Sequence, residues 1–261
     1  MSFEPLENLN GQTVVIAGAM GGVGYATARR LAARGARIIG LVRRNLDTAQ
    51  EKLDELPNAH LNHLAILADV TVREQLTEAR DQIDQCDILI NASGSSVFIP
   101  RVRVDLLSDK IFDTILTDNL RSQFSIIRTF LPLIKKSPTG LIVNLGSTAG
   151  AGVGGSNIAY AAAKAGIESI TRNLSMAILP TRIINVVFTG VETDFIKHRP
   201  DNFYELERDQ NPMGRCPTVD DIANTIEAYA TVVRFTTGVS IVVDGGKSLY
   251  RGQPKVKQNE T

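Results

Sequence analysis

The sequence is poor in the residues that build disulfide frameworks and metal sites. It contains two cysteines, Cys86 and Cys216, and three histidines among its 261 residues. Two cysteines supply no disulfide framework, and neither stands near a plausible base, so we expect two structural thiols in a reducing cytosol. The histidines, His60, His63 and His198, are too scattered for the ligand spacing of a metal site. We therefore expect no metal.

Neither sign of charge is in excess. The 28 lysines and arginines balance the 28 aspartates and glutamates, which gives no support for binding to nucleic acid. No uninterrupted apolar run approaches the length of a membrane span. The N-terminal stretch MSFEPLENLN is polar and acidic and lacks the basic and apolar regions of a secretory signal. We expect a cytoplasmic protein with no nucleic-acid or membrane partner, and a loose polar tail over residues 251–261.

Short apolar runs alternate with helix-like segments along the chain. The run Leu141–Leu145 is apolar and rich in β-branched residues, as expected of a strand that is buried in a parallel sheet. Thr71 and Ser108 stand where helix N-caps are expected. The alternation predicts one α/β domain over residues 1–261, with about seven parallel strands and helices on both faces. The predicted strands are Thr13–Ala17, Ala36–Val42, Leu64–Ala68, Asp87–Ile90, Leu141–Leu145, Arg182–Phe188 and Val239–Val243.

A glycine-rich turn joins the first predicted strand to the first predicted helix. It contains Gly18, Gly21, Gly22 and Gly24. Such glycines let the backbone pass close to a pyrophosphate, and the N-terminus of the following helix faces its negative charge. Glycine is common in strand–helix turns, so the turn alone is a weak signal. Its place after the first strand of an α/β chain favours a Rossmann-type, doubly wound fold with a dinucleotide site.

Tyr160 and Lys164 lie four residues apart in a predicted helix that begins near Asn157, so they share one helix face. A tyrosine with its usual pKa of about 10 transfers protons poorly at neutral pH. A lysine ammonium one turn away favours the phenolate and lowers that pKa. Ser147, just past a predicted strand, could hold a substrate oxygen beside the tyrosine. Taken alone, such a Tyr-x-x-x-Lys pair is more often an ordinary helix with a surface lysine.

The set Ser147, Tyr160 and Lys164 resembles the catalytic residues of the short-chain dehydrogenase/reductase family, including the separation of the serine from the tyrosine. The resemblance covers nearly the whole chain. It implies that Tyr160 transfers a proton, that Ser147 orients and stabilises the substrate oxygen, and that Lys164 lowers the tyrosine pKa and holds the nicotinamide ribose. Asn119 then supports the lysine through a water. The simpler alternative for Asn119 is a helix asparagine that faces solvent.

The resemblance also implies a nicotinamide cofactor, and the end of the second strand favours NADP(H). NAD-binding members carry an acidic residue there; here the matching position is Val42, and Arg43 and Arg44 follow. A guanidinium at this corner can bind the 2′-phosphate of NADP. The alternative is a solvated surface pair of arginines. The implied cofactor contacts are Gly18, Met20, Gly21, Gly22, Val23, Gly24, Arg43, Arg44, Asp69, Val70, Asn91, Ala92, Gly94, Tyr160, Lys164, Val191 and Thr193.

Three positions depart from the family's usual motifs. Ala17 stands where the family usually has a threonine before the first glycine, and Ala92 replaces the second asparagine of Asn-Asn-Ala-Gly. Thr189 replaces the proline of a Pro-Gly pair. Gly94 is kept, and its lack of a side chain lets the backbone lie close to a cofactor. These changes weaken single motifs but leave every site at the C-terminal end of a strand, where such sheets bind ligands.

The resemblance implies an oxidoreductase that interconverts a ketone and a secondary alcohol by hydride transfer, similar to carbonyl and ketoacyl reductases. Two alternatives stay open: an epimerase or dehydratase of the same fold, and a non-enzymatic NADP-binding regulator or scaffold. The intact set of Asn119, Ser147, Tyr160 and Lys164 argues against the scaffold. The substrate cannot be predicted, because the lid that the family carries over residues 191–215 sets selectivity.

Family members also assemble into dimers and tetramers through two helices that pair across a two-fold axis. The predicted counterparts here are Asp109–Lys135 and Asn157–Leu179. The first helix has more apolar residues than one core-facing stripe requires, although all of them could be core. We therefore expect a homodimer or homotetramer. The apolar residues in question are Ile111, Ile115, Ile126 and Phe130.

Overall fold

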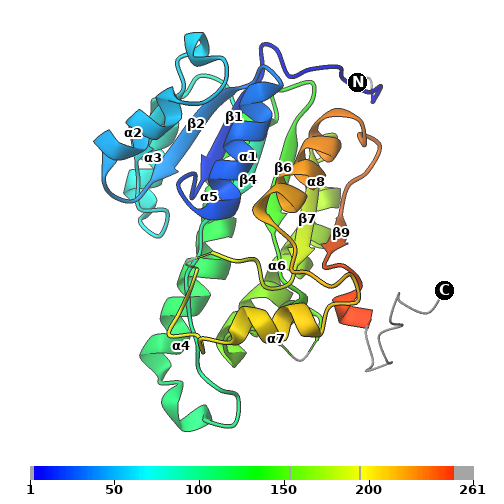
Figure 1. The fold of residues 1–261 in the computed structure, drawn as a ribbon. Coiled ribbons are helices and arrows are strands. Elements are labelled where there is room, and N and C mark those ends of the chain that lie inside the picture. The colour runs from blue at the N-terminus through cyan, green and yellow to red at the C-terminus, as the bar shows by residue number, and fades with distance from the viewer. Residues whose placement is uncertain (1–2, 153, 194, 250–261) are drawn as a thin grey trace, which may run out of the picture.

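The computed structural model describes residues 3–249 except residues 153 and 194, and these form a parallel sheet between two layers of helices (Figure 1). The sheet has seven strands in the order β3-β2-β1-β4-β6-β7-β9, which confirms the predicted fold class. The predicted tail over residues 251–261 lies outside the described residues. The strands are β1 (Thr13–Ala17), β2 (Arg37–Val42), β3 (Leu64–Leu67), β4 (Ile88–Asn91), β6 (Leu141–Leu145), β7 (Arg182–Phe188) and β9 (Val239–Val243).

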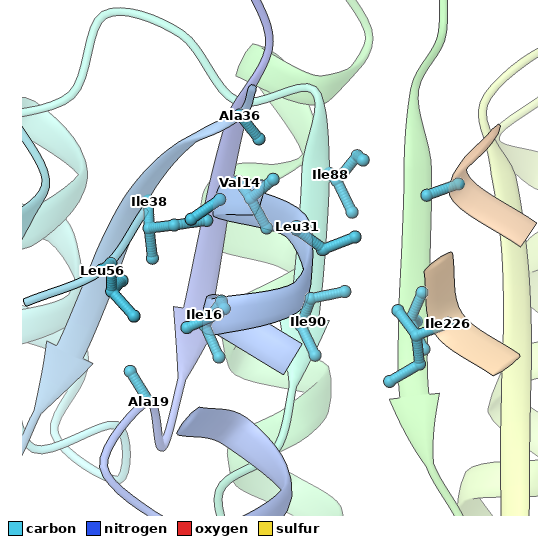
Figure 2. Packing of buried hydrophobic residues seen from close by; sticks show 14 of the residues in the cluster. Val14, Ile16, Ala19, Leu31, Ala36, Ile38, Leu56, Ile88, Ile90 and Ile226 are labelled. Carbon is cyan, nitrogen blue, oxygen red and sulfur yellow. The ribbon is translucent and has the colours of Figure 1, made fainter. Parts of the chain in front are cut away.

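The strands are mostly apolar because both faces of the sheet are covered. Along β1, Val14 and Ile16 belong to one hydrophobic cluster, whereas Val15 belongs to another on the opposite face. Figure 2 shows the first cluster, in which Leu31 from the adjacent helix lies among residues of β1 and β4 such as Val14 and Ile90. Burial on both faces explains why continuous apolar runs, and not alternating patterns, mark these strands.

Three helices cover each face of the sheet. The first cluster receives side chains from α1 (Gly22–Ala33), α2 (Leu46–Asp54) and α8 (Val219–Thr231). The second receives them from α3 (Arg73–Asp81), α5 (Ser122–Ile134) and α6 (Ile158–Ala177). The strand order reverses between β1 and β4, so the C-terminal ends of these strands border the crevice where open α/β sheets bind ligands.

The predicted continuous helix over Asp109–Lys135 is divided into three parts. Helix α4 (Asp109–Leu116) is followed by a π-helical turn over Thr117–Arg121, and then by α5. The turn contains Asn119, whose side-chain amide donates a hydrogen bond to the Ile115 carbonyl at 2.9 Å. A π turn inserts an extra residue into the helix and is often found at functional sites. Here it brings a polar side chain to a position that a regular helix would not give it.

One of the two predicted helix caps is confirmed and the other is wrong. The Ser108 hydroxyl accepts a hydrogen bond from the Ile111 amide at 3.4 Å, at the start of α4. Thr71 caps no helix, because α3 begins only after Val72. Its hydroxyl instead donates to the Asp69 carboxylate at 2.7 Å. The ionised Asp69 carboxylate, two residues before Thr71, is a strong acceptor. It therefore binds the Thr71 hydroxyl, and the chain forms a local turn there instead of a helix cap.

The predicted lid contains regular structure in the part that the structure describes. A two-residue strand, β8 (Ile196–Lys197), pairs in parallel with β5 (Ser96–Val97). A short helix, α7 (Phe203–Asp209), follows it. Helix α7 lies below the C-terminal ends of the strands in Figure 1. The lid is thereby hydrogen-bonded to the segment that follows β4.

The expectations drawn from composition concerned the cysteines, metal sites and membrane spans. Cys86 and Cys216 are both free thiols, and burial raises the pKa of the Cys86 thiol far above its ordinary value, as expected of a structural cysteine. Among residues 3–249, apart from 153 and 194, three or more potential metal-binding side chains nowhere gather into a cluster. In the same part of the chain, every helix is too short or too polar to span a bilayer.

Candidate active site

Ser147, Tyr160 and Lys164 lie together at the C-terminal edge of the sheet. Ser147 follows β6, and the other two residues lie one turn apart on α6. The Ser147 side chain is hydrogen-bonded to the Tyr160 phenol, and the Lys164 Nζ lies 5.5 Å from the centre of the tyrosine ring. Tyr160 is 9% exposed and Lys164 5%. The structure thus brings into one buried cluster the three residues that the sequence placed in one site.

Burial dominates the electrostatics of this cluster. It raises the pKa of Tyr160 to about 12, although the hydrogen bond with Ser147 acts in the opposite direction. It lowers the pKa of Lys164 to about 8. The lysine Nζ donates a 2.7 Å hydrogen bond to the Leu145 carbonyl. The expected lowering of the tyrosine pKa by the lysine is therefore absent here, because removal from water penalises the charged form of each group.

Asn119 is fully buried, which excludes the alternative of a solvent-facing helix residue. Its side-chain amide donates to the carbonyls of Ser95 at 2.7 Å and Ile115 at 2.9 Å. Its Oδ1 has no hydrogen-bond partner among the described residues. A Cβ at Gly94 would lie 2.6 Å from that oxygen, so the glycine leaves room for it. Buried acceptors are normally paired, so this oxygen is available to a water or ligand donor.

Asn157 also positions the tyrosine, and sequence reasoning assigned it no role. Its Oδ1 accepts a hydrogen bond from the Tyr160 backbone amide at 2.8 Å, which caps α6. Its Nδ2 donates to the Val97 carbonyl at 2.8 Å, on β5. The side chain therefore ties the first turn of the helix to the strand that pairs with the lid. An asparagine immediately before the helix was the available signal.

The glycine turn after β1 has the shape of a dinucleotide cradle. Gly18 has φ of +80°, and a Cβ there would come within 2.8 Å of the Ala92 backbone. A Cβ at Gly24 would lie 2.2 Å from the Gly18 carbonyl oxygen. Side chains are thus excluded at Gly18 and Gly24. Gly21 occupies the N-cap of α1 and supplies no side-chain bond, so the first amides of the helix can face an anion.

The end of β2 presents arginines to solvent. Arg43 and Arg44 are exposed, and in the described part of the chain Arg43 forms neither a side-chain hydrogen bond nor an ion pair. Its charge helps to hold the pKa of Asp69 below the ordinary value. The Val42 side chain, 5% exposed, packs in the first hydrophobic cluster. Arg43, one of the two predicted arginines, is therefore the first exposed side chain at this corner.

Other predicted cofactor residues surround the same edge. A Cβ at Gly22 would lie 2.7 Å from the Thr193 Cγ2, so the loop after β7 lies against the start of α1. The Asp69 carboxylate accepts hydrogen bonds from the amide and hydroxyl of Thr71. Val191 is 8% exposed and packs in the first cluster. The remaining predicted contacts, Met20, Val23, Val70 and Ala92, are partly buried against the core clusters.

A row of buried asparagines crosses the sheet just below this edge. Asn91, Asn144 and Asn185 are register partners on β4, β6 and β7. The Asn91 side-chain amide donates to Asn144 at 2.8 Å, and Asn144 donates to the Thr171 hydroxyl of α6 at 3.0 Å. The row connects the strand end at Gly94 to the helix that carries Tyr160. Among these only Asn91 was predicted to belong to the site, although a polar residue in each apolar run was visible.

The predicted lid segment contacts Tyr160 directly. The Phe195 ring lies 5.8 Å from the Tyr160 ring, centre to centre. Phe195 also lies near Gly94, since a Cβ there would be 3.5 Å from Cε2 of the ring. Tyr160, Ala149 and Ile115 form a small buried cluster to which Phe195 and Val97 are added as partly buried members. The tyrosine therefore has an apolar surround that excludes water and explains its raised pKa.

Comparisons with known proteins agree with this geometry. The family model described as short chain dehydrogenase matches residues 12–202. The chain is 30% identical over 246 residues to the 3-oxoacyl-acyl-carrier-protein reductase FabG of Escherichia coli strain K12, with 92% of this chain and 98% of the relative covered. It is 28% identical over 242 residues to a putative ketoacyl reductase 2 of the granaticin polyketide synthase from Streptomyces violaceoruber, covering 90% and 95%.

Solved structures give the same result. A dehydrogenase/reductase from Sinorhizobium meliloti 1021 superposes with a TM-score of 0.81 at 26% identity, covering 92% of this chain and 96% of the other. A short-chain dehydrogenase/reductase from Serratia marcescens superposes with a TM-score of 0.82 at 25% identity, covering 92% and 99%. The matched family segment takes in both the glycine turn and the cluster around Tyr160. The chain belongs to the short-chain dehydrogenase/reductase family and is an oxidoreductase.

Proposed function

We propose that this protein is an NADP(H)-dependent enzyme that interconverts a ketone and a secondary alcohol. The observation that carries the proposal is the buried cluster in which Ser147 is hydrogen-bonded to Tyr160 and the Lys164 Nζ lies 5.5 Å from the tyrosine ring. The cluster borders the glycine turns at Gly18 and Gly94, which fit a dinucleotide. A bound nicotinamide supplies the hydride in reduction and accepts it in oxidation.

Each polar residue of the cluster has a separate task in this proposal. With a pKa of about 12, Tyr160 is protonated at neutral pH and can donate its proton to a carbonyl oxygen as the ketone is reduced. The Ser147 hydroxyl beside it orients and stabilises that oxygen. Lys164 uses one donor on Leu145 and keeps two for a ribose hydroxyl or a water. The unpaired Asn119 Oδ1 is suited to accept from that water.

The residues that would hold the cofactor lie along the edge from β2 to β7. Positions 18 and 24 of the turn admit no side chains, and the first turn of α1 behind it suits a pyrophosphate. The exposed Arg43 guanidinium suits a 2′-phosphate. We assign Val191 and Thr193 to the nicotinamide end. This arrangement supports NADP over NAD.

The substrate is a ketone that places apolar groups beside Phe195 and Val97, which flank the tyrosine. Two relatives are named as reductases of ketoacyl compounds, so 3-oxoacyl thioesters are the first class to test. We assign the lid to residues 191–215, as in the sequence-based prediction. Its contact with Tyr160 through Phe195 supports a role in selecting the substrate.

The experiment is a loss of NADPH fluorescence with a panel of ketones that includes 3-oxoacyl thioesters and simple aliphatic and aromatic ketones. Turnover with at least one ketone supports the proposal. NADPH binding without turnover across the panel would favour the scaffold. Exchange of a substrate stereocentre or loss of water, with no net change in NADPH, would favour the epimerase or dehydratase. The four-residue set of Asn119, Ser147, Tyr160 and Lys164 supports the first outcome.

We also propose a homodimer or homotetramer built on the face of α4, α5 and α6. Three of the four residues suggested by the sequence do not carry this proposal, because Ile115, Ile126 and Phe130 are buried in the core, whereas Ile111 is partly buried. Phe124, on α5, is an exposed apolar residue on this face. It lines a groove together with Asp113, Leu116, Thr117, Leu120, Arg121 and Ile170. A cytoplasmic location is part of the same proposal and agrees with two unpaired cysteines.

A further inference from the structure

The lid helix α7 sends an acidic side chain to the loop that follows β7. The Glu207 carboxylate accepts hydrogen bonds from the Thr189 hydroxyl at 2.9 Å and from the Gly190 amide at 3.3 Å. Thr189 stands where the family usually has a proline. Proline has no hydroxyl, so the shorter of these two bonds depends on the residue particular to this chain.

Tyr204 lies three residues before Glu207 and reaches the same loop from the same helix face. Its hydroxyl accepts a hydrogen bond from the Thr193 amide at 3.2 Å and donates one to the Val191 carbonyl at 2.9 Å. The two side chains therefore bind the loop at both ends, from residue 189 to residue 193. Val191 and Thr193 are the residues that we assign to the nicotinamide end of the cofactor.

A third segment completes the contact. The Lys247 ammonium forms an ion pair with Glu207, and the two side chains are only 16% and 17% exposed. Lys247 follows the turn after β9, which lies beside β7 in the sheet. A partly buried pair is screened less by water than a surface pair, so the carboxylate is held firmly between the loop and the turn.

We infer that Glu207 and Tyr204 are positioning residues for the cofactor: from the lid helix, they fix the backbone of residues 189–193 against the start of α1. The inference deepens the proposed function and rests on it. The Thr193 side chain lies against Gly22 at the start of α1, so the loop must stay close to the glycine turn for both to contact one cofactor. If the lid helix releases the loop, Thr193 is no longer held beside the glycine turn, and the cofactor loses its fixed contacts at the nicotinamide end.

A positioning role and a merely structural role for the lid predict different effects on the affinity for NADPH. A structural contact would change the stability of the protein and leave the affinity of the folded protein for NADPH unaltered. A positioning contact raises the Kd and the KM for NADPH, and it leaves the KM for the ketone within about twofold. Since glutamine keeps an acceptor oxygen for Thr189 and Gly190, it should restore most of what leucine loses.

The test titrates NADPH fluorescence with the wild type and with Glu207→Leu, Glu207→Gln and Tyr204→Phe. Loss of charge-assisted hydrogen bonds predicts an affinity about tenfold weaker for Glu207→Leu, and a smaller loss for the other two. Asp209→Asn is the matched control, because Asp209 is an exposed acid on the same helix. Its NADPH affinity should equal that of the wild type.

Two results would overturn the inference. One is NADPH affinity in folded Glu207→Leu equal to that of the wild type; the other is a glutamine variant as weak as the leucine variant. A wild type that binds no NADPH would instead contradict the proposed function, so the two failures are distinguishable. If Glu207→Leu does not fold, Tyr204→Phe decides, because it removes one hydroxyl only. An unaltered NADPH affinity in Tyr204→Phe then refutes the inference. Because the variant loses about one hydrogen bond, an NADPH affinity at least threefold weaker supports it.

Discussion

The Lys164 ammonium lies 5.5 Å from the centre of the Tyr160 ring and yet donates its hydrogen bond to a backbone carbonyl, that of Leu145. Both side chains are buried, and both pKa values are displaced toward the neutral form, to about 12 for the tyrosine and about 8 for the lysine. At neutral pH the tyrosine is thus a proton donor and the lysine a cation. This combination suits the reduction of a ketone, in which the oxygen must gain a proton.

Tyr160→Phe should abolish turnover and leave NADPH binding nearly unchanged. The substitution keeps the ring that packs against Phe195 and removes only the hydroxyl that is bonded to Ser147. Loss of general acid catalysis typically lowers kcat by about 10²–10⁴-fold. Steady-state kinetics with the best ketone of the panel measures the effect, and Tyr229→Phe, on α8 away from the cluster, is the control. Near-normal turnover in the Tyr160 variant would refute the assignment.

The buried Lys164 should make stability depend on alkaline pH. Below pH 8 both the folded and unfolded states bind the proton, and burial of the charge destabilises the folded state. Between about 8 and 10.5, the unfolded value, only the unfolded state binds it, so the free energy of unfolding rises with pH. The rise contributed by this group amounts to at most about 3 kcal/mol, from about 1.4 kcal/mol per pKa unit.

Urea unfolding at pH 7.5 and pH 10 measures the contribution of Lys164 as the difference in the free energy of unfolding between the wild type and Lys164→Met. The wild type should gain stability relative to the variant as the pH rises. Lys135→Met is the control, because it makes the same change of residue type at an exposed position. A wild type that loses stability relative to Lys164→Met between these pH values would mean that the lysine pKa is raised, and not lowered, by folding.

The sequence predicted the sheet well because its strands are buried on both faces. A run such as Leu141–Leu145, the partner of β4 and β7, is apolar except for Asn144, and that pattern is visible without a structure. The glycines at 18 and 94 were equally visible, since each marks a backbone that approaches another chain segment too closely for a side chain. The apolar runs and the glycines can both be recognised from a few neighbouring residues in the sequence.

Features that depend on contacts distant in the sequence were not predicted. The π turn at Asn119 involves a hydrogen bond to Ser95, 24 residues away. The strand β5 becomes a strand only through pairing with β8, a hundred residues later. The tyrosine pKa was predicted in the wrong direction, because the spacing to Lys164 shows a neighbouring charge but does not show how completely Phe195 and the core remove water.

Phe124→Asp should convert the protein to monomers. Phe124 is 39% exposed and lines the groove on the face of α4, α5 and α6. The substitution would remove an apolar ring from the two-fold interface and require a carboxylate to be removed from water there, which is unfavourable. Light scattering at micromolar concentration measures the mass. Leu67→Asp, an exposed apolar residue on the edge strand β3, is the control and should keep the wild-type mass. A monomeric wild type would refute the proposed assembly.

The cofactor preference should depend on Arg43. The wild type should bind NADP about ten- to a hundredfold more tightly than NAD, because a charge-assisted hydrogen bond to the 2′-phosphate contributes about 1.5–3 kcal/mol. Arg43→Asp should reverse the preference, since it removes the cation and places an acceptor where a free 2′-hydroxyl can donate. An acid at Val42 would not serve this purpose, because that side chain is 5% exposed and its replacement would disrupt the core.

Fluorescence titration of both cofactors at one salt concentration measures the preference. Arg37→Asp is the matched control, because Arg37 lies at the opposite end of β2 and is also exposed. Arg37→Asp changes the net charge by the same amount as Arg43→Asp, so a general electrostatic effect on phosphate binding appears in both variants. A change of cofactor preference in Arg43→Asp alone is therefore a local effect of Arg43. Raising the salt should narrow the wild-type preference, as expected for an exposed guanidinium. Equal or tighter binding of NAD by the wild type would show that Arg43 is a solvated surface residue and not a phosphate ligand.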